Sequence, residues 1–213
     1  APVLDVAGLM ALPLFRERSE REVDLLLRAT ARGINAPLTS SCGRLFDAVA
    51  ALAGGCTRTS YEGQAAAELE AALWRERSSA NPKAGYPLEI FEAADGPPML
   101  DPRPLWPALL EDVAAGRPAG AIAWRFHVGL VRAVLAMIER LAGAEPDLRL
   151  RPLVLSGGAF QNAFLLRALR AELARRGFRV LTHWRLPPND GGVAVGQAVV
   201  AAATSKRSIR ACA

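Results

Sequence analysis

LRPLVLSGGAFQN, residues 150–162, is the stretch that decides the fold of this chain. Its apolar residues 153–155 predict a short buried strand, which runs into a glycine pair and then a helix from about Phe160. A helix N-terminus gathers unpaired N–H groups and partial positive charge, and Gly157 and Gly158 allow a ligand to approach the backbone closely. The stretch therefore predicts either a phosphate-binding turn or a plain tight turn between strand and helix.

A second strand and a second glycine pair follow. The helical pattern ends at Gly177, and residues 178–183 predict a strand, so strand, helix and strand form a βαβ unit with parallel strands. Ligands of such sheets bind beyond the carboxyl ends of the strands. Asn162 stands on the first loop and Asp190 on the second, where Asp190 is either a helix N-cap or a ligand. Together the loops predict a nucleotide or metal–nucleotide cleft.

The N-terminal part of the chain predicts helices. Ser19 and Glu22 have the spacing of a capping box, which opens a helix that ends near Gly33. Residues 42–52 carry an apolar helical stripe with Asp47 beside it. A carboxylate in apolar surroundings needs a partner, which is either a nearby arginine or a ligand hydroxyl.

Two further helical patterns contain an unusual residue each. Residues 61–74 predict a helix with Gly63 near its start, and a glycine inside a helix costs about 1 kcal/mol relative to alanine. Gly63 therefore indicates either close approach of another group or a helix that begins later. The longest pattern, residues 120–143, has His127 on its apolar face, where a histidine is a core residue more often than a ligand.

Residues 78–118 form a small insertion rich in proline. The segment 88–91 predicts a strand, with 99–105 as its edge partner and a short helix around 109–113. We predict an insertion rather than a separate domain, because the segment is too short to bury a core of its own.

Composition narrows the class of protein. The chain has 213 residues and a formal charge of +5, and its arginines are dispersed without an aromatic platform, so we expect no nucleic-acid partner. Three cysteines without CxxC spacing fit a reducing compartment, the cytoplasm. No apolar run reaches about 18 residues, so we expect no membrane association.

Four segments together resemble one family: residues 39–52 (TSSCGRLFDAVAAL), 60–70 (SYEGQAAAELE), 123–131 (AWRFHVGLV) and 153–198. They are similar to the HypF family, the carbamoyltransferases of nickel–iron hydrogenase maturation, in their Kae1-like domain. The resemblance covers nearly the whole chain. It implies an RNase H-like, actin-like ATPase (ASKHA) α/β lobe with a mixed sheet flanked by helices. Residues 1–213 would be the second lobe, and the first lobe and the upstream domains would lie outside it.

The resemblance also implies a reaction. Family members make carbamoyl-adenylate from carbamoyl phosphate and ATP, and then transfer the carbamoyl group to the C-terminal cysteine of the partner HypE. Because the first lobe is missing, we expect this chain alone to be inactive. The alternatives are an acceptor that is a small-molecule hydroxyl or is linked to tRNA, and a lobe that only binds nucleotide or docks a partner.

Site residues follow from the same resemblance, and none of them is assigned a catalytic role. A divalent metal, zinc or iron, would be bound by Asp190 and completed by histidines outside this chain, since its only histidines are His127 and His183. No role is assigned to His127. The residues implied to bind nucleotide are Gly157 and Gly158 at the phosphate, Asn162 at the nucleotide, Asp47 at the ribose and Gly63 in a neighbouring loop.

Overall fold

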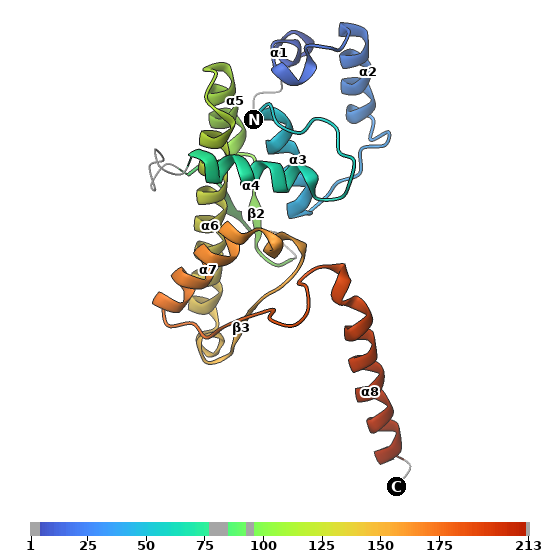
Figure 1. The fold of residues 1–213 in the computed structure, drawn as a ribbon, viewed down its shortest axis with the longest axis vertical. Coiled ribbons are helices and arrows are strands. Elements are labelled where there is room, and N and C mark those ends of the chain that lie inside the picture. The colour runs from blue at the N-terminus through green and yellow to red at the C-terminus, as the bar shows by residue number, and fades with distance from the viewer. Residues whose placement is uncertain (1–4, 77–84, 93–95, 212–213) are drawn as a thin grey trace. The chain divides into compact units, whose positions relative to one another are not determined.

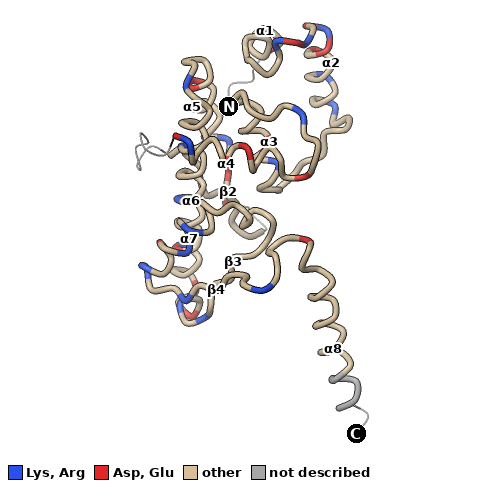
Figure 2. Tube along the Cα trace, viewed as in Figure 1, with Lys and Arg blue, Asp and Glu red and all other residues tan. Residues whose placement is uncertain are grey.

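The structure, a computed structural model, describes residues 5–76, 85–92 and 96–211, with side chains as far as Ser205. The chain divides into two compact units, Ala1–Ala144 and Glu145–Ala213, which are described separately (Figure 1). The first is mostly helical with an antiparallel hairpin, and the second contains a parallel strand pair. Lysine and arginine residues are scattered along the trace of both units (Figure 2).

Unit 1 begins with short helices. α1 (Val6–Met10) and the 3-10 turn η1 (Pro13–Phe15) precede α2 (Glu20–Ala31). The predicted capping box is confirmed, because the Ser19 side chain accepts from the Glu22 amide while the Glu22 carboxylate accepts from the Ser19 amide.

Three helices form the core of unit 1: α3 (Cys42–Leu52), α4 (Gln64–Glu76) and α6 (Ala119–Ala144). Apolar side chains from all three are fully buried, among them Val49, Leu73 and Phe126. The predicted start of the second of these helices was too early. Gly63 has φ +81° and stands before α4, so it makes the turn into the helix, and a Cβ at this position would meet no atom of the structure within 4 Å.

The predicted hairpin and helix of the insertion are confirmed within the described residues. β1 (Glu89–Phe91) pairs antiparallel with β2 (Met99–Asp101), and α5 (Leu105–Ala114) follows. Residues 77–84 and 93–95 of the insertion lie outside the described part.

Asp112 of α5 ties the insertion to α6 through a buried polar cluster. Its carboxylate accepts a hydrogen bond of 2.6 Å from the Tyr86 hydroxyl and pairs with Arg117 at 2.7 Å and with Arg125. The Arg125 guanidinium also lies 4.4 Å from the centre of the Tyr86 ring. Burial, followed by the hydrogen bond to Asp112, raises the pKa of Tyr86 above its ordinary value. We call this set the Asp112 cluster.

Two glycines let the backbone at Tyr86 cross α6. A Cβ on Gly129 would overlap the carbonyl oxygen of Tyr86, and a Cβ on Gly85 would lie 2.7 Å from the amide nitrogen of Gly129. The backbone at Tyr86 is also held by its own amide, which donates a hydrogen bond of 2.9 Å to the Arg125 carbonyl. The crossing therefore depends on the absence of side chains.

By length and composition alone, α6 is the one helix among the described residues that could cross a membrane. Half of its most apolar window is buried inside the structure. This burial comes from packing against α3 and α4, as expected of the central helix of a folded unit.

Unit 2 contains the predicted βαβ unit. β3 (Leu153–Leu155) and β4 (Val180–Thr182) pair in parallel, and α7 (Ala163–Arg175) connects them. The α/β class is therefore confirmed. The parallel and antiparallel pairs that a mixed sheet would contain lie in two separate two-stranded sheets among the described residues. The remaining elements of unit 2 are η3 (Pro146–Leu150), η4 (Gly158–Gln161), η5 (Asp190–Gly192) and α8 (Val193–Ala211).

Candidate functional site

The loops after β3 and β4 meet, as the sequence predicts. The Gly157 amide donates to the Pro188 carbonyl at 2.9 Å, and the Ser156 Oγ lies 2.8 Å from the His183 Nε2. Register explains this meeting, because Leu155 pairs with Thr182 and the two next residues are Ser156 and His183. Each loop therefore leaves its strand at the same edge of the parallel pair.

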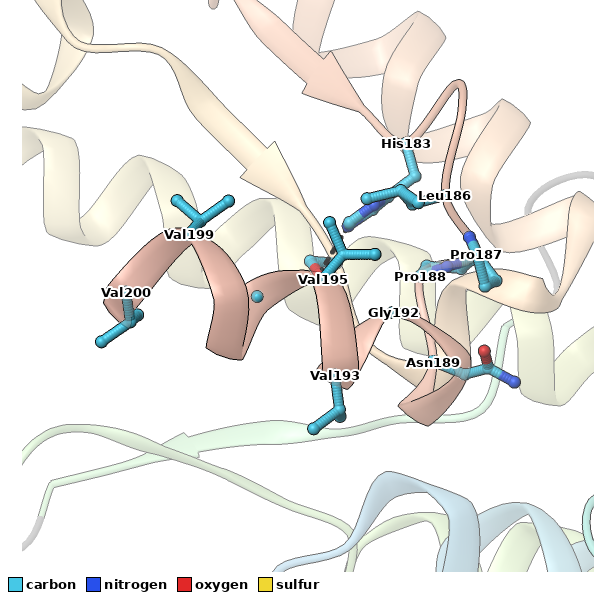
Figure 3. A pocket seen from close by; sticks show the side chains of 12 residues that line it. His183, Leu186, Pro187, Pro188, Asn189, Gly192, Val193, Val195, Val199 and Val200 are labelled. Carbon is cyan, nitrogen blue, oxygen red and sulfur yellow. Dashed lines mark hydrogen bonds between the residues drawn. The ribbon is translucent and has the colours of Figure 1, made fainter. Parts of the chain in front are cut away.

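A hollow of about 520 Å³ lies between these loops and the first turns of α8 (Figure 3). Ser156, His183 and Asn189 bring polar groups to it. Its other lining is apolar, and the figure shows Leu186, the two prolines of the loop and the valines of α8 around it. An apolar hollow with a few converging polar groups is the usual form of a small-molecule site.

The SGG turn offers fewer amides to a phosphate than the sequence suggests. Gly157 has φ +102°, a conformation that L side chains rarely adopt, and its amide is used by the Pro188 carbonyl. Within the described part of the chain, the amides of Gly158 and Ala159, at the start of η4, have no hydrogen-bond acceptor. Gly157 therefore supplies the turn, the amides of Gly158 and Ala159 are the donors it leaves available, and the phosphate contact of this turn stays a prediction.

Asn162 has a structural role that the sequence did not reveal. The predicted helix from Phe160 is a 3-10 turn, and α7 begins only at Ala163, with Asn162 as its N-cap. The buried Asn162 Oδ1 accepts from the Leu165 amide at 2.9 Å. This cap fixes the amide group close to the SGG turn, and its contact with a nucleotide stays a prediction.

Asp190 lies in the second loop but is not the N-cap of the helical turn η5. Asn189 is the N-cap of η5, and its side chain accepts from the Gly191 amide at 3.2 Å. The carboxylate of Asp190 is exposed and has no hydrogen bond or ion pair among the described residues. Those residues contain no group of three His, Cys, Asp or Glu that could hold a metal ion. One carboxylate does not make a zinc site, so Asp190 alone does not fit the metal.

Asp47 and Gly63 belong to unit 1, whereas the other predicted site residues belong to unit 2. Asp47 pairs with Arg44 at 2.9 Å one helical turn away, which is the ion-pair alternative for this residue. The side chain of Asp47 stays about a quarter exposed, at 28%. Its ribose contact and the nucleotide role of Gly63 stay predictions.

His127 is a core residue, the more frequent of the two alternatives. It is fully buried, its Nδ1 lies 2.7 Å from the Ala123 carbonyl, and its ring packs edge to face with Phe46 at 5.3 Å. Burial lowers the pKa of His127 to about 4. A neutral, enclosed imidazole of this kind supports packing rather than a ligand.

The sequence reasoning missed the Ser156–His183 pair and the Asp112 cluster. The pair could have been found, because both residues immediately follow strands that were predicted to be parallel neighbours. The cluster joins residues from three separate segments, and no sequence spacing indicates it.

Comparison with known proteins places the chain in a family. Residues 4–197 match the family model of the carbamoyltransferase Kae1-like domain, second subdomain. Carbamoyltransferase HypF of Rhodobacter capsulatus is 42% identical over 203 residues, which cover 94% of this chain and 24% of that protein. A HypF homolog of Cupriavidus necator is 35% identical and is covered over 45% of its length.

Solved structures agree with the sequence comparison. A full-length HypF in a phosphate- and nucleotide-bound form aligns with a TM-score of 0.77 and 33% identity, over 92% of this chain and 30% of the other. The present chain thus spans about a quarter of the Rhodobacter capsulatus relative. The sequence match, the α/β fold and the two joined glycine loops lead to one conclusion: the chain belongs to the HypF carbamoyltransferase family, in the second subdomain of its Kae1-like domain.

Proposed function

We propose that the chain is the nucleotide-facing part of an enzyme that moves a carbamoyl group from carbamoyl-adenylate to the C-terminal cysteine of HypE. Carbamoyl phosphate and ATP would supply the adenylate, the process would be hydrogenase maturation, and the compartment would be the cytoplasm. The observation that carries the proposal is the junction of the two loops after β3 and β4, with the Gly158 and Ala159 amides beside it.

The two amides suit the leaving group of this transfer. Backbone N–H groups held by a fixed turn stabilise negative charge on a phosphate without having to reorient during the reaction. The Gly157–Pro188 hydrogen bond fixes that turn against the second loop. These amides would therefore bind the adenylate phosphate and favour its departure.

The attacking nucleophile comes from the acceptor rather than from this chain. Burial raises the pKa of the Cys42 thiol, and desolvation together with the charge of Glu68 raises that of Cys56. Each shift disfavours the thiolate, which is the reactive form. Cys212 lies outside the described residues.

A divalent metal would be bound on this side by Asp190 alone, with the remaining ligands supplied from outside the chain. When bound, such an ion would polarise the carbamoyl or phosphate oxygens. Because the described residues do not complete the site, no step of the transfer is derived from it.

Asp190→Ala tests the proposal in a protein that joins this chain to the remaining sequence of its Rhodobacter capsulatus relative. We expect carbamoylation of HypE to be lost, as measured by mass spectrometry of its C-terminal peptide. Asp147→Ala, an exposed aspartate of unit 2 outside the two loops, is the matched control. Undiminished transfer in the Asp190 variant would mean that the lobe only docks a partner. Turnover by residues 1–213 alone would contradict the expected dependence on the first lobe.

A further inference from the structure

The Ser156–His183 pair has the geometry of a hydroxyl and its base. The Ser156 Oγ and the His183 Nε2 are 2.8 Å apart, within the range of a hydroxyl-to-imidazole hydrogen bond. Both residues are exposed, and both line the hollow between the two loops and α8 (Figure 3). The pair is therefore accessible to a substrate that enters the hollow.

The pair is not needed to hold the loops together. The Gly157 amide already joins the first loop to the second through the Pro188 carbonyl. The register of β3 and β4 also brings the two loop starts side by side. The Ser156–His183 hydrogen bond is therefore a second link between the loops, and its two side chains are free to take part in a reaction.

Among the residues that line the hollow, His183 is the one that places a ring nitrogen beside the Ser156 hydroxyl. From its own loop the hollow is lined by Leu186, Pro187, Pro188 and Asn189, and from α8 by glycine and valines. None of these lining groups titrates. Arg185 and Asp190 are the charged residues nearest in sequence within the second loop, and neither lines the hollow.

We propose that Ser156 and His183 accept the proton of the acceptor nucleophile during carbamoyl transfer. Ser156 would contact the acceptor, and His183 would act through Ser156 as a positioning residue that takes the proton onward. This inference rests on the proposed function and adds to it the part of the site that receives the acceptor. The adenylate phosphate would be held by the neighbouring Gly158 and Ala159 amides.

The step balances without a further reactant. The sulfur of the acceptor thiol attacks the carbamoyl carbon, so a C–S bond forms. The bond from that carbon to the phosphate oxygen breaks, and its electron pair leaves with AMP. The thiol proton passes to the Ser156 Oγ as the Ser156 hydroxyl proton passes to the His183 Nε2, from which it is released to solvent.

The test uses Ser156→Ala and His183→Gln in the chain joined to the rest of its Rhodobacter capsulatus relative. Exchange of pyrophosphate into ATP, dependent on carbamoyl phosphate, reports adenylate formation. Transfer to the HypE cysteine reports the second step. We expect unchanged exchange and transfer slowed on the order of 10²-fold in both variants, the usual contribution of a positioned proton acceptor. Ser205→Ala, an exposed serine on α8, is the matched control and should transfer normally.

Two further readouts separate chemistry from a structural role. The transfer rate of the parent should fall on the acidic side of its pH profile, and His183→Gln should lose that dependence. Ser156→Thr keeps the hydroxyl and should restore transfer. Normal transfer in either Ser156→Ala or His183→Gln, or an unchanged acidic limb in His183→Gln, would overturn the inference. A parent protein that makes adenylate and transfers nothing would instead contradict the proposed function.

Discussion

At the scale of the residue, Asn162 has a structural role as a helix cap and a predicted role as a nucleotide contact. Its Oδ1 caps α7, and the capped turn begins directly after the SGG loop. A substitution at this position therefore changes stability as well as any nucleotide contact, and the two effects have to be separated.

Asn162→Ser and Asn162→Ala separate them. Alanine removes the cap and should lower the free energy of unfolding by about 1 kcal/mol, whereas serine keeps a capping oxygen and should cost little. Both remove the amide group, so both should weaken nucleotide binding if Asn162 contacts the nucleotide. Urea titration and calorimetric nucleotide binding in the joined protein measure the two quantities. Binding of parental strength in the serine variant would leave Asn162 as a cap only.

His127 makes the stability of unit 1 depend on pH. Its pKa in the folded protein is about 4, against an ordinary value of 6.5, so the unfolded chain binds a proton more readily than the folded one. The stabilisation is complete above about pH 6.5 and is lost as pH falls toward 4, by up to about 3 kcal/mol. From pH 7.5 to 4.5, the free energy of unfolding of the parent should fall relative to that of His127→Leu. Parallel curves would contradict this assignment.

Roles that depend on nearby residues could be predicted from the sequence, and a role that depends on a distant loop could not. The capping box of Ser19 and Glu22 could be predicted because it is local. The burial of His127 followed from its place on an apolar face. That the Gly157 amide is already used could not be predicted, because its acceptor, Pro188, belongs to a loop after the next strand.

At the scale of the element, two glycines of α6 differ in whether a side chain would fit at their position. A methyl group at Gly129 would overlap the backbone of Tyr86, whereas one at Gly143 would have no atom within 4 Å. Both positions are helical, so they differ in their surroundings rather than in backbone conformation.

Gly129→Ala should therefore destabilise the protein by about 1–3 kcal/mol, the usual cost of overpacking. Gly143→Ala should instead stabilise it by up to about 1 kcal/mol, because alanine is the better helix former. Thermal and denaturant unfolding of the two variants check this contrast. Equal effects would show that the segment at Tyr86 does not press on α6.

Element boundaries were predicted less well than the elements themselves. The helix predicted from 61 begins at Gln64, because Gly63 adopts a left-handed turn before it. The helix predicted from Phe160 begins at Ala163, because the backbone first makes a 3-10 turn. Turn geometry decided both cases, and composition reports it only weakly.

At the scale of the whole molecule, the two units differ in how much they bury. Unit 1 encloses apolar side chains from α3, α4, α5 and α6. Unit 2 buries Leu155, Phe178 and three leucines of α7, and the valines at the start of α8 are exposed. No described residue of α8 is coloured as charged in Figure 2, and residues 191–205 of the sequence contain no Asp, Glu, Lys or Arg.

We expect residues 1–144 to unfold cooperatively as a separate protein and residues 145–213 not to do so. A two-stranded sheet that buries apolar side chains of α7, with the valines at the start of α8 exposed, provides too small a core for independent stability. Near-ultraviolet circular dichroism during heating distinguishes the two fragments. A sharp transition in the shorter fragment would contradict this expectation.

The Asp112 cluster has a consequence for how the sequence can drift among relatives. Replacing Asp112 alone would leave two arginine charges without their carboxylate partner, and one of these arginines has a largely enclosed side chain. Replacing either arginine alone would remove one of the two positive charges that pair with the buried carboxylate. Substitutions at Asp112, Arg117, Arg125 and Tyr86 are thus expected to co-vary, so that relatives keep the set together or exchange it together for apolar side chains. Four positions that look independent along the chain then evolve as one character.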